Sequence, residues 1–321
     1  MAVPSFGAAT TMPSEENDEP AAAGGGKNVV HNKQGIDMLH GRIWTKVLRF
    51  ALPVAATGIL EQLFNASGIM IVGNFSQSDG TAAVAAVGSN APVTGLILNL
   101  FIGIALGANV VIANAIGRGS REAVRNAVHT SIVTALIGGV IVAIIGELLA
   151  GPLLGMLNVT ADVFPLALAY LRIYLIGMPV ILLYNFETAI FRSIGDTQAP
   201  LAVLAISGVL NVTVGLIFVV LFHWGVSGVA TATVIANVVS SMILLYRLVH
   251  TDAAIHVDLR EFGIDWFTLR QILRIGLPAG VQSAVFAVAN IIIQAAINSL
   301  GTVVMAASSA AFNIEIIAYY V

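Results

Sequence analysis

The segment LRFALPVAATGILEQLFNASGIMIVGNF, residues 48–75, is long and apolar enough to cross a lipid bilayer. A membrane-spanning helix needs about 20 predominantly apolar residues. Runs of that length recur at about residues 47–72, 81–113, 122–150, 164–191, 199–222, 226–249 and 267–297, and an eighth starts near residue 301. We expect helices, because an open strand edge would leave backbone groups unsatisfied in hydrocarbon.

The composition agrees with a chain that lies mostly in lipid. It is 58% hydrophobic and only 10% charged, whereas a soluble domain carries about 25% charged residues. The absence of cysteine excludes disulfides and thiolate metal sites. Residues 1–40 are polar, include the acidic run SEENDEP, and lack the apolar region of a signal peptide, so they predict a disordered cytoplasmic tail.

The basic residues predict the orientation of these helices. Of the 14 Lys and Arg residues, all but Arg172 fall on one side of the membrane if the amino terminus is cytoplasmic. The positive-inside rule therefore favours a cytoplasmic amino terminus. For Arg172, we expect snorkelling or pairing near the outer surface, with Asp162 or Glu147 as the candidate partners; a charge that lines a cavity or outer gate is the alternative.

The first spanning segment is repeated later in the chain. LRFALPVAATGILEQLFN (48–65) is matched by LRIGLPAGVQSAVFAVAN (273–290), and GTAAVAA (80–86) by GTVVMAA (301–307). The identical pairs of the first match are Leu48 and Leu273, Arg49 and Arg274, Leu52 and Leu277, Pro53 and Pro278, and Asn65 and Asn290. One repeat spans six helices, which predicts two pseudosymmetric six-helix lobes in the same orientation.

This all-α polytopic arrangement gives a domain plan. Residues 41–250 form the first lobe with helices 1–6, residues 251–266 a cytoplasmic linker, and residues 267–321 the start of the second lobe with helices 7 and 8. We expect roughly 170 further residues to complete the twelve helices, each needing about 20 residues to span.

Several motifs, in order along residues 45–321, resemble those of multidrug and toxic compound extrusion (MATE) transporters. They are LPVAATGILEQLFN with VGNF and AAVGSNAP, GANVVIANAIGRGSREAVRNAVHT, YNFETAIFRSIGDTQAP, and GVSGVATATVIANV. The resemblance implies alternating access and efflux of amphiphilic, often cationic compounds in exchange for H⁺ or Na⁺. It also implies a bacterial inner-membrane protein that functions as a monomer.

Local chemistry gives these motifs structural interpretations. Pro53, Pro92, Pro179 and Pro278 free carbonyls within the membrane. Gly103 and Gly107 form GxxxG, which favours close helix packing over a ligand role. Asp196 and Thr197 are expected to cap the fifth helix.

Three acids lie at membrane depth: Glu61, Glu187 and Glu315. Such residues are functional candidates because they are costly to place there. For Glu187, an ion pair with Arg192 or partial solvation is expected. Glu61 shares a helix face with Asn65 and Gly68, at i, i+4 and i+7. We interpret Glu61 as a buried carboxylate at which protons and cations compete; packing against another helix, through Gln62 for example, is the alternative.

The sequence departs from the family where the coupling acids are expected. By resemblance, carboxylates belong at Gly68 in the first helix and at Gly215, four residues after Asn211, in the fifth. A third position, after the proline of helix 7, is Phe286. A Na⁺ site near Asn211 is therefore weakly supported, and no other metal site is predicted. The substrate or cation-coupling candidates are Glu61, Asn65, Gly68, Glu187, Asn211, Thr233 and Asn290.

Drug/cation antiport is the leading function. A lipid-linked oligosaccharide flippase of the same superfamily would need several basic residues in its cavity, and a truncated, non-transporting membrane protein is another alternative. An enzyme is not expected, because GxxxxGK[ST], HExxH and GxSxG are absent. The expected partners are the bilayer and small amphiphilic cations, with no cofactor and no nucleic acid.

Overall fold

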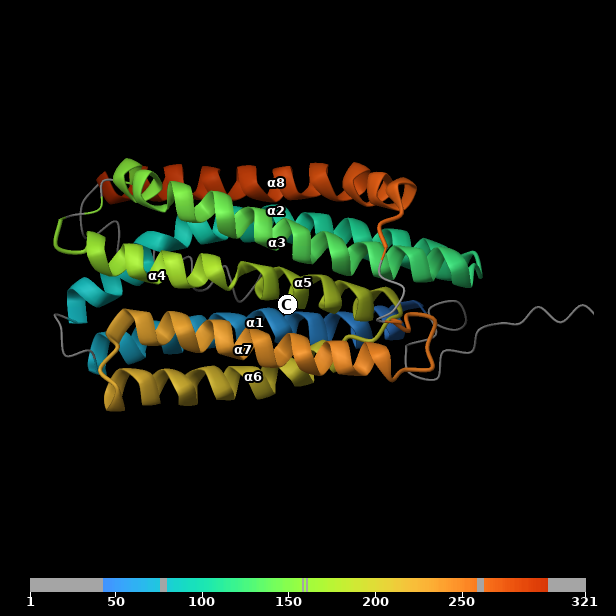
Figure 1. Cartoon of the computed structure of the whole chain (residues 1–321), viewed down its shortest axis with the longest axis horizontal. Coiled ribbons are helices and arrows are strands. Elements are labelled where there is room, and N and C mark those ends of the chain that lie inside the picture. The colour runs from blue at the N-terminus through green and yellow to red at the C-terminus, as the bar shows by residue number, and fades with distance from the viewer. Residues whose placement is uncertain (1–42, 76–79, 158, 160, 259–262, 300–321) are drawn as a thin grey trace, which may run out of the picture. The chain divides into compact units, whose positions relative to one another are not determined.

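The computed structural model describes residues 43–75, 80–157, 159, 161–258 and 263–299. The chain divides into residues 1–30 and residues 31–321, and every described residue belongs to the second unit. Its elements, in chain order, are α1 (Ile43–Phe75), α2 (Gly80–Gly117), α3 (Arg121–Met156), α4 (Phe164–Ile176), α5 (Met178–Ser193), α6 (Gln198–Leu216), the π-helix η1 (Ile217–Leu221), α7 (Gly225–Val249) and α8 (Trp266–Ser299) (Figure 1).

These helices confirm the predicted all-α polytopic fold. Six of them are long and apolar enough to span a membrane, and the α4–α5 pair raises the number to seven. They correspond to the first seven predicted spans, with ends that differ by a few residues. The predicted eighth helix, including Glu315, lies outside the described residues.

The fourth span was predicted as one helix, and the structure corrects this. It is broken into α4 and α5, which meet at an angle of 53°. Gly177 is the residue between them, and Pro179 stands in the first turn of α5. Proline has no N–H to donate and clashes with the preceding turn, so it ends or bends a helix. The chain therefore changes direction in the middle of this membrane span.

Glycines allow α2 and α8 to pack along each other more extensively than any other pair of helices. A Cβ at Gly107 would lie 2.7 Å from the backbone nitrogen of Gly276. A Cβ at Gly103 would overlap the backbone of Gly280, and one at Gly276 would lie 2.6 Å from Cα of Ile104. The prediction that this GxxxG serves packing is confirmed, and its partner is a second Gly-x-x-x-Gly in α8.

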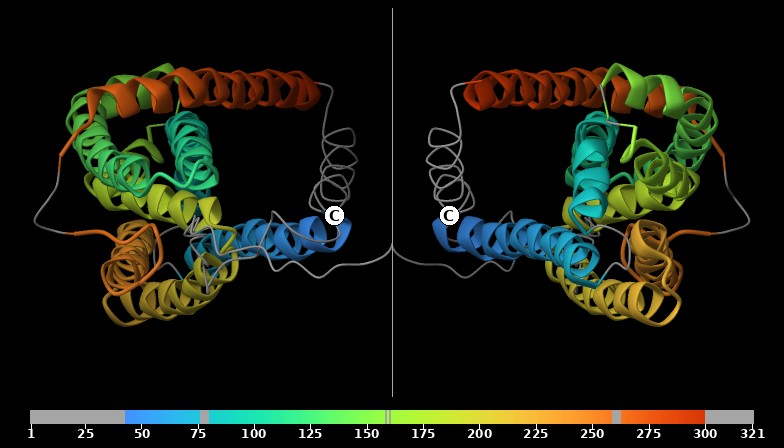
Figure 2. Two further views of the ribbon diagram at one scale, coloured as in Figure 1. Left: turned by 90° about the vertical axis from the view of Figure 1, so that its right-hand side faces the viewer. Right: turned by 90° about the vertical axis from the view of Figure 1, so that its left-hand side faces the viewer.

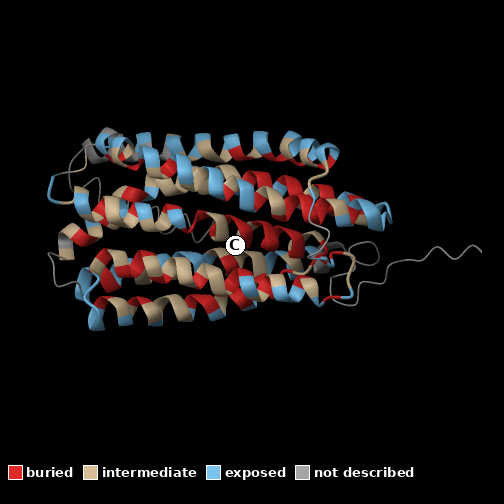
Figure 3. Ribbon diagram, viewed as in Figure 1, coloured by how far each residue is buried: buried red, intermediate tan, exposed pale blue. Residues whose placement is uncertain are grey.

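The remaining contacts show that α1 and α8 pack mainly against different partner helices. α1 contacts α2, α6 and α7, whereas α8 contacts α2 and α3, and α1 and α8 do not touch. Figure 2 shows α8 on the α2–α3 side and α1 on the α6–α7 side. Many residues of both helices are exposed, and Figure 3 shows this exposure along α8.

The predicted linker is docked onto the helices next to it. Ile255 and Val257 are fully buried. The backbone N–H of Asp258 donates to Nε2 of His129 (3.4 Å), and that of Asp265 donates to Oγ1 of Thr130 (3.1 Å). Residues 251–258 and 263–265 therefore form an ordered connection against α3.

The expected cap of the fifth spanning helix is half confirmed. The backbone N–H groups of Gln198 and Ala199 donate to Oδ1 of Asp196, at 3.1 and 3.0 Å. Thr197 is the residue before α6, but its side chain makes no capping hydrogen bond. Its buried hydroxyl has no hydrogen-bond partner among the residues that the structure describes. Thr197 has αR backbone angles (φ −98°, ψ −12°), whereas a capping hydroxyl reaches the first amides of a helix from an extended backbone.

Asp265 caps α8, and its removal should fray that helix in a pH-dependent way. The Thr268 hydroxyl, together with the backbone N–H groups of Phe267 and Thr268, holds the pKa of Asp265 below its ordinary value of 3.8. A lowered pKa means that the cap stabilises above the unfolded-state pKa and is lost as the pH falls through the folded-state pKa. For Asp265→Ala we expect a loss of about 0.5 kcal/mol, because solvent screens this exposed group.

Hydrogen exchange measures this effect directly. At pH 7, the amides at the start of α8 should exchange about twofold faster in Asp265→Ala than in the wild type, as about 0.5 kcal/mol predicts. The ratio should approach one at acid pH. A ratio of one across the whole pH range would show that the carboxylate contributes nothing to the cap.

Candidate functional site

Glu61 is the candidate acid with the most polar surroundings. It lies on α1, is exposed, and is not covered by other described helices. Its charge interacts with that of Arg192 at the end of α5, without a direct ion pair, and its field reaches the phenols of Tyr174 and Tyr184. Since α1 does not pack on α4 or α5, these groups face Glu61 from a distance.

The described residues leave the side chain of Glu61 exposed, while its carboxylate lies within electrostatic reach of α4 and α5, so the burial of Glu61 stays a prediction. Gln62 is exposed as well, so the alternative of Glu61 packed against a helix through Gln62 is not seen. Asn65, one turn later, is also exposed. The reason is that α1 buries its opposite side on α6, α2 and α7 and leaves the face of Glu61 and Asn65 open.

The two glycines that replace expected acids come together where α1, α6 and α7 meet. A Cβ at Gly68 would lie 3.2 Å from Cγ1 of Val229. A Cβ at Gly215 would lie 3.7 Å from Cβ of Ala232 and from Cδ1 of Ile71. Gly68 and Ile71 are neighbouring positions on α1, and Val229 and Ala232 on α7. This junction is lined with aliphatic groups.

Two of the polar candidates, Asn211 and Thr233, lie beside this junction. Thr233 donates its hydroxyl to the carbonyl of Val229 (3.0 Å). Asn211 is half-buried one turn before Gly215. A hard cation needs several oxygen ligands, preferably including a carboxylate. Within the described ranges, no group of three His, Cys, Asp or Glu residues could hold a metal ion.

Glu187 is fully buried on α5, which contradicts the expected solvation. Neither carboxylate oxygen has a hydrogen-bond partner, and no ion pair with Arg192 forms within the described part of the chain. Ser241 of α7 faces the carboxyl group but does not meet hydrogen-bond geometry. The neighbouring hydroxyls of Tyr184 and Thr188 are likewise buried, with no hydrogen-bond partner in the part of the chain that the structure describes. Helical spacing explains the missing pair, because Glu187 and Arg192, five residues apart, point in different directions.

The remaining candidates fall outside this region. Arg172 on α4 pairs with Glu147 on α3 through Nε and Oε2 at 3.3 Å, and both side chains are partly exposed. The predicted pairing is therefore confirmed, with Glu147 and not Asp162 as the partner. The side chain of Asn290 lies outside the described residues, although its backbone belongs to α8.

The structure thus separates the candidates into three groups. Glu61 and Asn65 share an open face of α1, while Gly68, Asn211 and Thr233 lie near the α1–α6–α7 junction. Glu187 lies on α5 and is buried against the helices that pack on it. Sequence reasoning missed Arg192 as the charge that interacts with Glu61, because it assigned that arginine to the nearer Glu187.

Comparisons with known proteins agree with this architecture. The MatE family model matches residues 53–217. The chain is 27% identical to the probable multidrug resistance protein YoeA of Bacillus subtilis, covering 81% of this chain and 57% of that protein. It is 27% identical to the probable multidrug resistance protein NorM of Thermotoga maritima, covering 75% of this chain and 52% of that protein.

A solved structure extends the likeness to three dimensions. An outward-facing multidrug resistance MATE family transporter superposes with a TM-score of 0.80 at 26% identity, covering 89% of this chain and 63% of that chain. The chain therefore spans less than two thirds of the length of each of these relatives.

Proposed function

Since the chain belongs to the MATE family of membrane transporters, we propose that it forms part of a secondary active transporter that exports amphiphilic cations in exchange for protons. The observation that carries this proposal is Glu61, an uncovered carboxylate on α1 whose charge interacts with Arg192. A carboxylate within a membrane segment is costly and is therefore a functional candidate. Relatives described as multidrug resistance proteins support efflux as the direction of transport.

Protons are a better match to this site than Na⁺. A sodium site needs several oxygen ligands around one point, and the family positions for two of them are Gly68 and Gly215. The groups that surround these glycines are aliphatic. A single accessible carboxylate is enough to bind a proton, because proton transfer requires no coordination shell.

In this proposal, Glu61 binds either a proton or the cationic substrate. The ionised carboxylate attracts a cation and also interacts with Arg192. Protonation removes the negative charge, which releases the cation and ends the attraction to Arg192. Because the two ligands compete for one group, the proton gradient drives export when access to Glu61 alternates between the two sides of the membrane.

The flippase alternative lacks support in the same region. Binding a pyrophosphate requires several basic groups close together. Arg172 is the basic residue that the predicted topology places near the outer surface, and its charge is neutralised by the ion pair with Glu147. The polar groups around Glu61 are two phenols and one arginine at the end of α5, which is too little positive charge for a diphosphate.

The substitution Glu61→Gln tests the proposal. It keeps the size of the side chain but removes the exchangeable proton. We expect the initial rate of ethidium efflux from cells to fall by about tenfold or more, as expected when a coupling free energy of about 1–3 kcal/mol is lost. Fluorescence of accumulated ethidium, with and without a protonophore, gives the proton-dependent part of the rate.

Glu147→Gln is the matched control, because it makes the same change in an acid that pairs with Arg172 on the outside of the site. It should retain most of the proton-dependent efflux. Undiminished proton-dependent efflux in Glu61→Gln, at equal amounts of protein in the membrane, would exclude Glu61 as the coupling group.

A further inference from the structure

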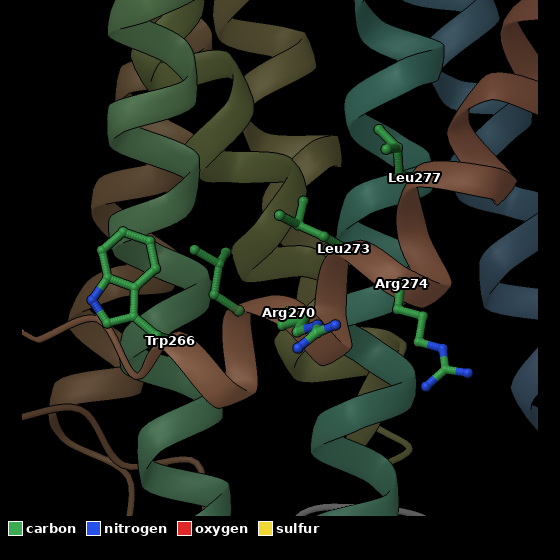
Figure 4. A pocket seen from close by; sticks show the side chains of 6 residues that line it. Trp266, Arg270, Leu273, Arg274 and Leu277 are labelled. Atoms are coloured by element: carbon green, nitrogen blue, oxygen red, sulfur yellow. The ribbon is translucent and has the colours of Figure 1, made fainter.

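A groove runs along the first three turns of α8 and has no role in the proposed transport step. Its volume is about 560 Å³, and it is lined by Trp266, Leu269, Arg270, Leu273, Arg274 and Leu277. Figure 4 shows Arg270 and Arg274 on successive turns of the helix, with Leu273 and Leu277 along the same stretch. The groove thus combines two guanidinium groups with a row of leucines.

The two arginines carry positive charge that is not neutralised. Both are exposed, and neither forms an ion pair or hydrogen bond within the residues that the structure describes. The nearest acid along the chain, Asp265, is occupied by the hydroxyl of Thr268 and two backbone N–H groups. Like charges four residues apart on a helix repel each other by a few tenths of a kcal/mol. An anion placed between them would remove this repulsion.

The groove lies beside the face of α8 that packs on its partner helices, and Trp266, Arg270, Arg274 and Leu277 are exposed along it. Within the described part of the chain, α8 contacts α2 and α3 through the adjoining side, around Ile272 and Gly276, and the half-buried Leu269 and Leu273 lie at the edge of that contact. Trp266 is 75% exposed at the first position of the helix. Tryptophan concentrates at the membrane–water interface, where its ring lies among headgroups. The predicted topology places this end of α8 at the cytoplasmic surface.

We propose that this groove binds one phospholipid with an anionic headgroup from the cytoplasmic leaflet. The phosphate accepts hydrogen bonds from the guanidinium groups of Arg270 and Arg274, since arginine binds phosphate oxygens in a bidentate manner. An acyl chain lies along Leu269, Leu273 and Leu277. Basic grooves at the cytoplasmic ends of spanning helices have the chemistry that anionic lipids recognise.

This proposal does not depend on Glu61 or on the coupling ion. It commits to a membrane lipid because the groove is both apolar and cationic. A soluble phosphate would use the arginines but not the three leucines. A helix from a partner protein would use the leucines but would leave two buried arginines unpaired, which is costly.

The test uses the fluorescence of Trp266. The chain has three tryptophans, so the variant Trp44→Phe/Trp224→Phe leaves Trp266 as the only emitter. The protein is reconstituted in phosphatidylcholine vesicles that contain a small fraction of brominated lipid, either phosphatidylglycerol or phosphatidylcholine. Bromine quenches nearby tryptophan. We expect brominated phosphatidylglycerol to quench Trp266 at a much lower mole fraction than brominated phosphatidylcholine.

Neutralising the arginines should remove this difference. Each basic residue near an anionic surface contributes about fivefold in binding, so Arg270→Gln/Arg274→Gln should weaken the selective quenching about 30-fold. Arg118→Gln/Arg247→Gln is the control, because it removes the same charge from two exposed positions at the same end of the helices, outside the groove. It should leave the selectivity intact.

Three results would overturn the proposal. Equal quenching by the two lipids would show that the site does not select anionic headgroups. Selectivity that survives Arg270→Gln/Arg274→Gln, or is lost equally in the control pair, would show that it arises from general surface charge. Absence of quenching by either lipid would show that protein covers the groove.

Discussion

Gly107→Leu is expected to separate α2 from α8 and to destabilise the protein strongly. A Cβ at this position would lie 2.7 and 2.8 Å from the backbone nitrogen and Cα of Gly276, and would overlap the carbonyl oxygen of Ile272. These atoms belong to a helix backbone, so they cannot move aside as a side chain could. Overpacking at such a contact costs about 3 kcal/mol. This corresponds to a fall of roughly 5–10 °C in Tm for a protein of this size.

Gly95→Leu provides the matched control on the same helix. A Cβ at Gly95 would find no atom within 4 Å, so the same substitution should leave Tm nearly unchanged. Thermal unfolding of the two purified variants, followed by size-exclusion chromatography after heating, measures the difference. Equal Tm values for Gly107→Leu and Gly95→Leu would mean that the close approach of α2 and α8 does not support the fold.

This contact shows which part of the fold could be predicted from sequence. Gly103 and Gly107 indicated close packing because small residues at a spacing of four let helices approach. The partner could not be deduced, although Gly276 and Gly280 have the same spacing. Periodicity describes one helix at a time, and pairing depends on how all the helices fit together. The bend at Gly177 was missed for a related reason, since hydropathy does not distinguish a straight span from a broken one.

The site was less predictable than the fold. The sequence identified Glu61 and Glu187 as acids at membrane depth, but the structure gives them opposite surroundings. Glu61 is exposed on α1, whereas Glu187 is fully buried among α5 and its neighbours. Exposure depends on which face of a helix the neighbouring helices cover, and a highly apolar helix does not reveal that face. The assignment of Arg192 to Glu187 failed for a different reason, because residues five apart on a helix point in different directions.

Replacing Glu187 by a neutral residue is expected to leave the stability of the protein nearly unchanged, whereas replacing it by a basic residue is expected to lower that stability. Both carboxylate oxygens are buried and have no hydrogen-bond partner among the described residues, and the polar groups beside them are the hydroxyls of Tyr184, Thr188 and Ser241. A buried ion without a partner is very costly, so such a group is stable in the fold only without its charge. Glutamine has the same size and no charge, and methionine has a similar shape. Glu187→Gln and Glu187→Met should therefore leave Tm close to that of the wild type.

Glu187→Lys should cost about 3 kcal/mol, because lysine would carry a charge into the same enclosed position without an acid to pair with it. The Tm values of the three variants, measured by thermal unfolding, separate the effect of the side chain's charge from the effect of its size. Glu187→Gln should also retain the proton-dependent ethidium efflux that Glu61→Gln loses, since the proton is proposed to bind the accessible carboxylate. If Glu187→Gln and Glu187→Met were as unstable as Glu187→Lys, an ionised Glu187 would be required by the fold. If Glu187→Gln remained stable but lost proton-dependent efflux, the coupling role would belong to the buried acid.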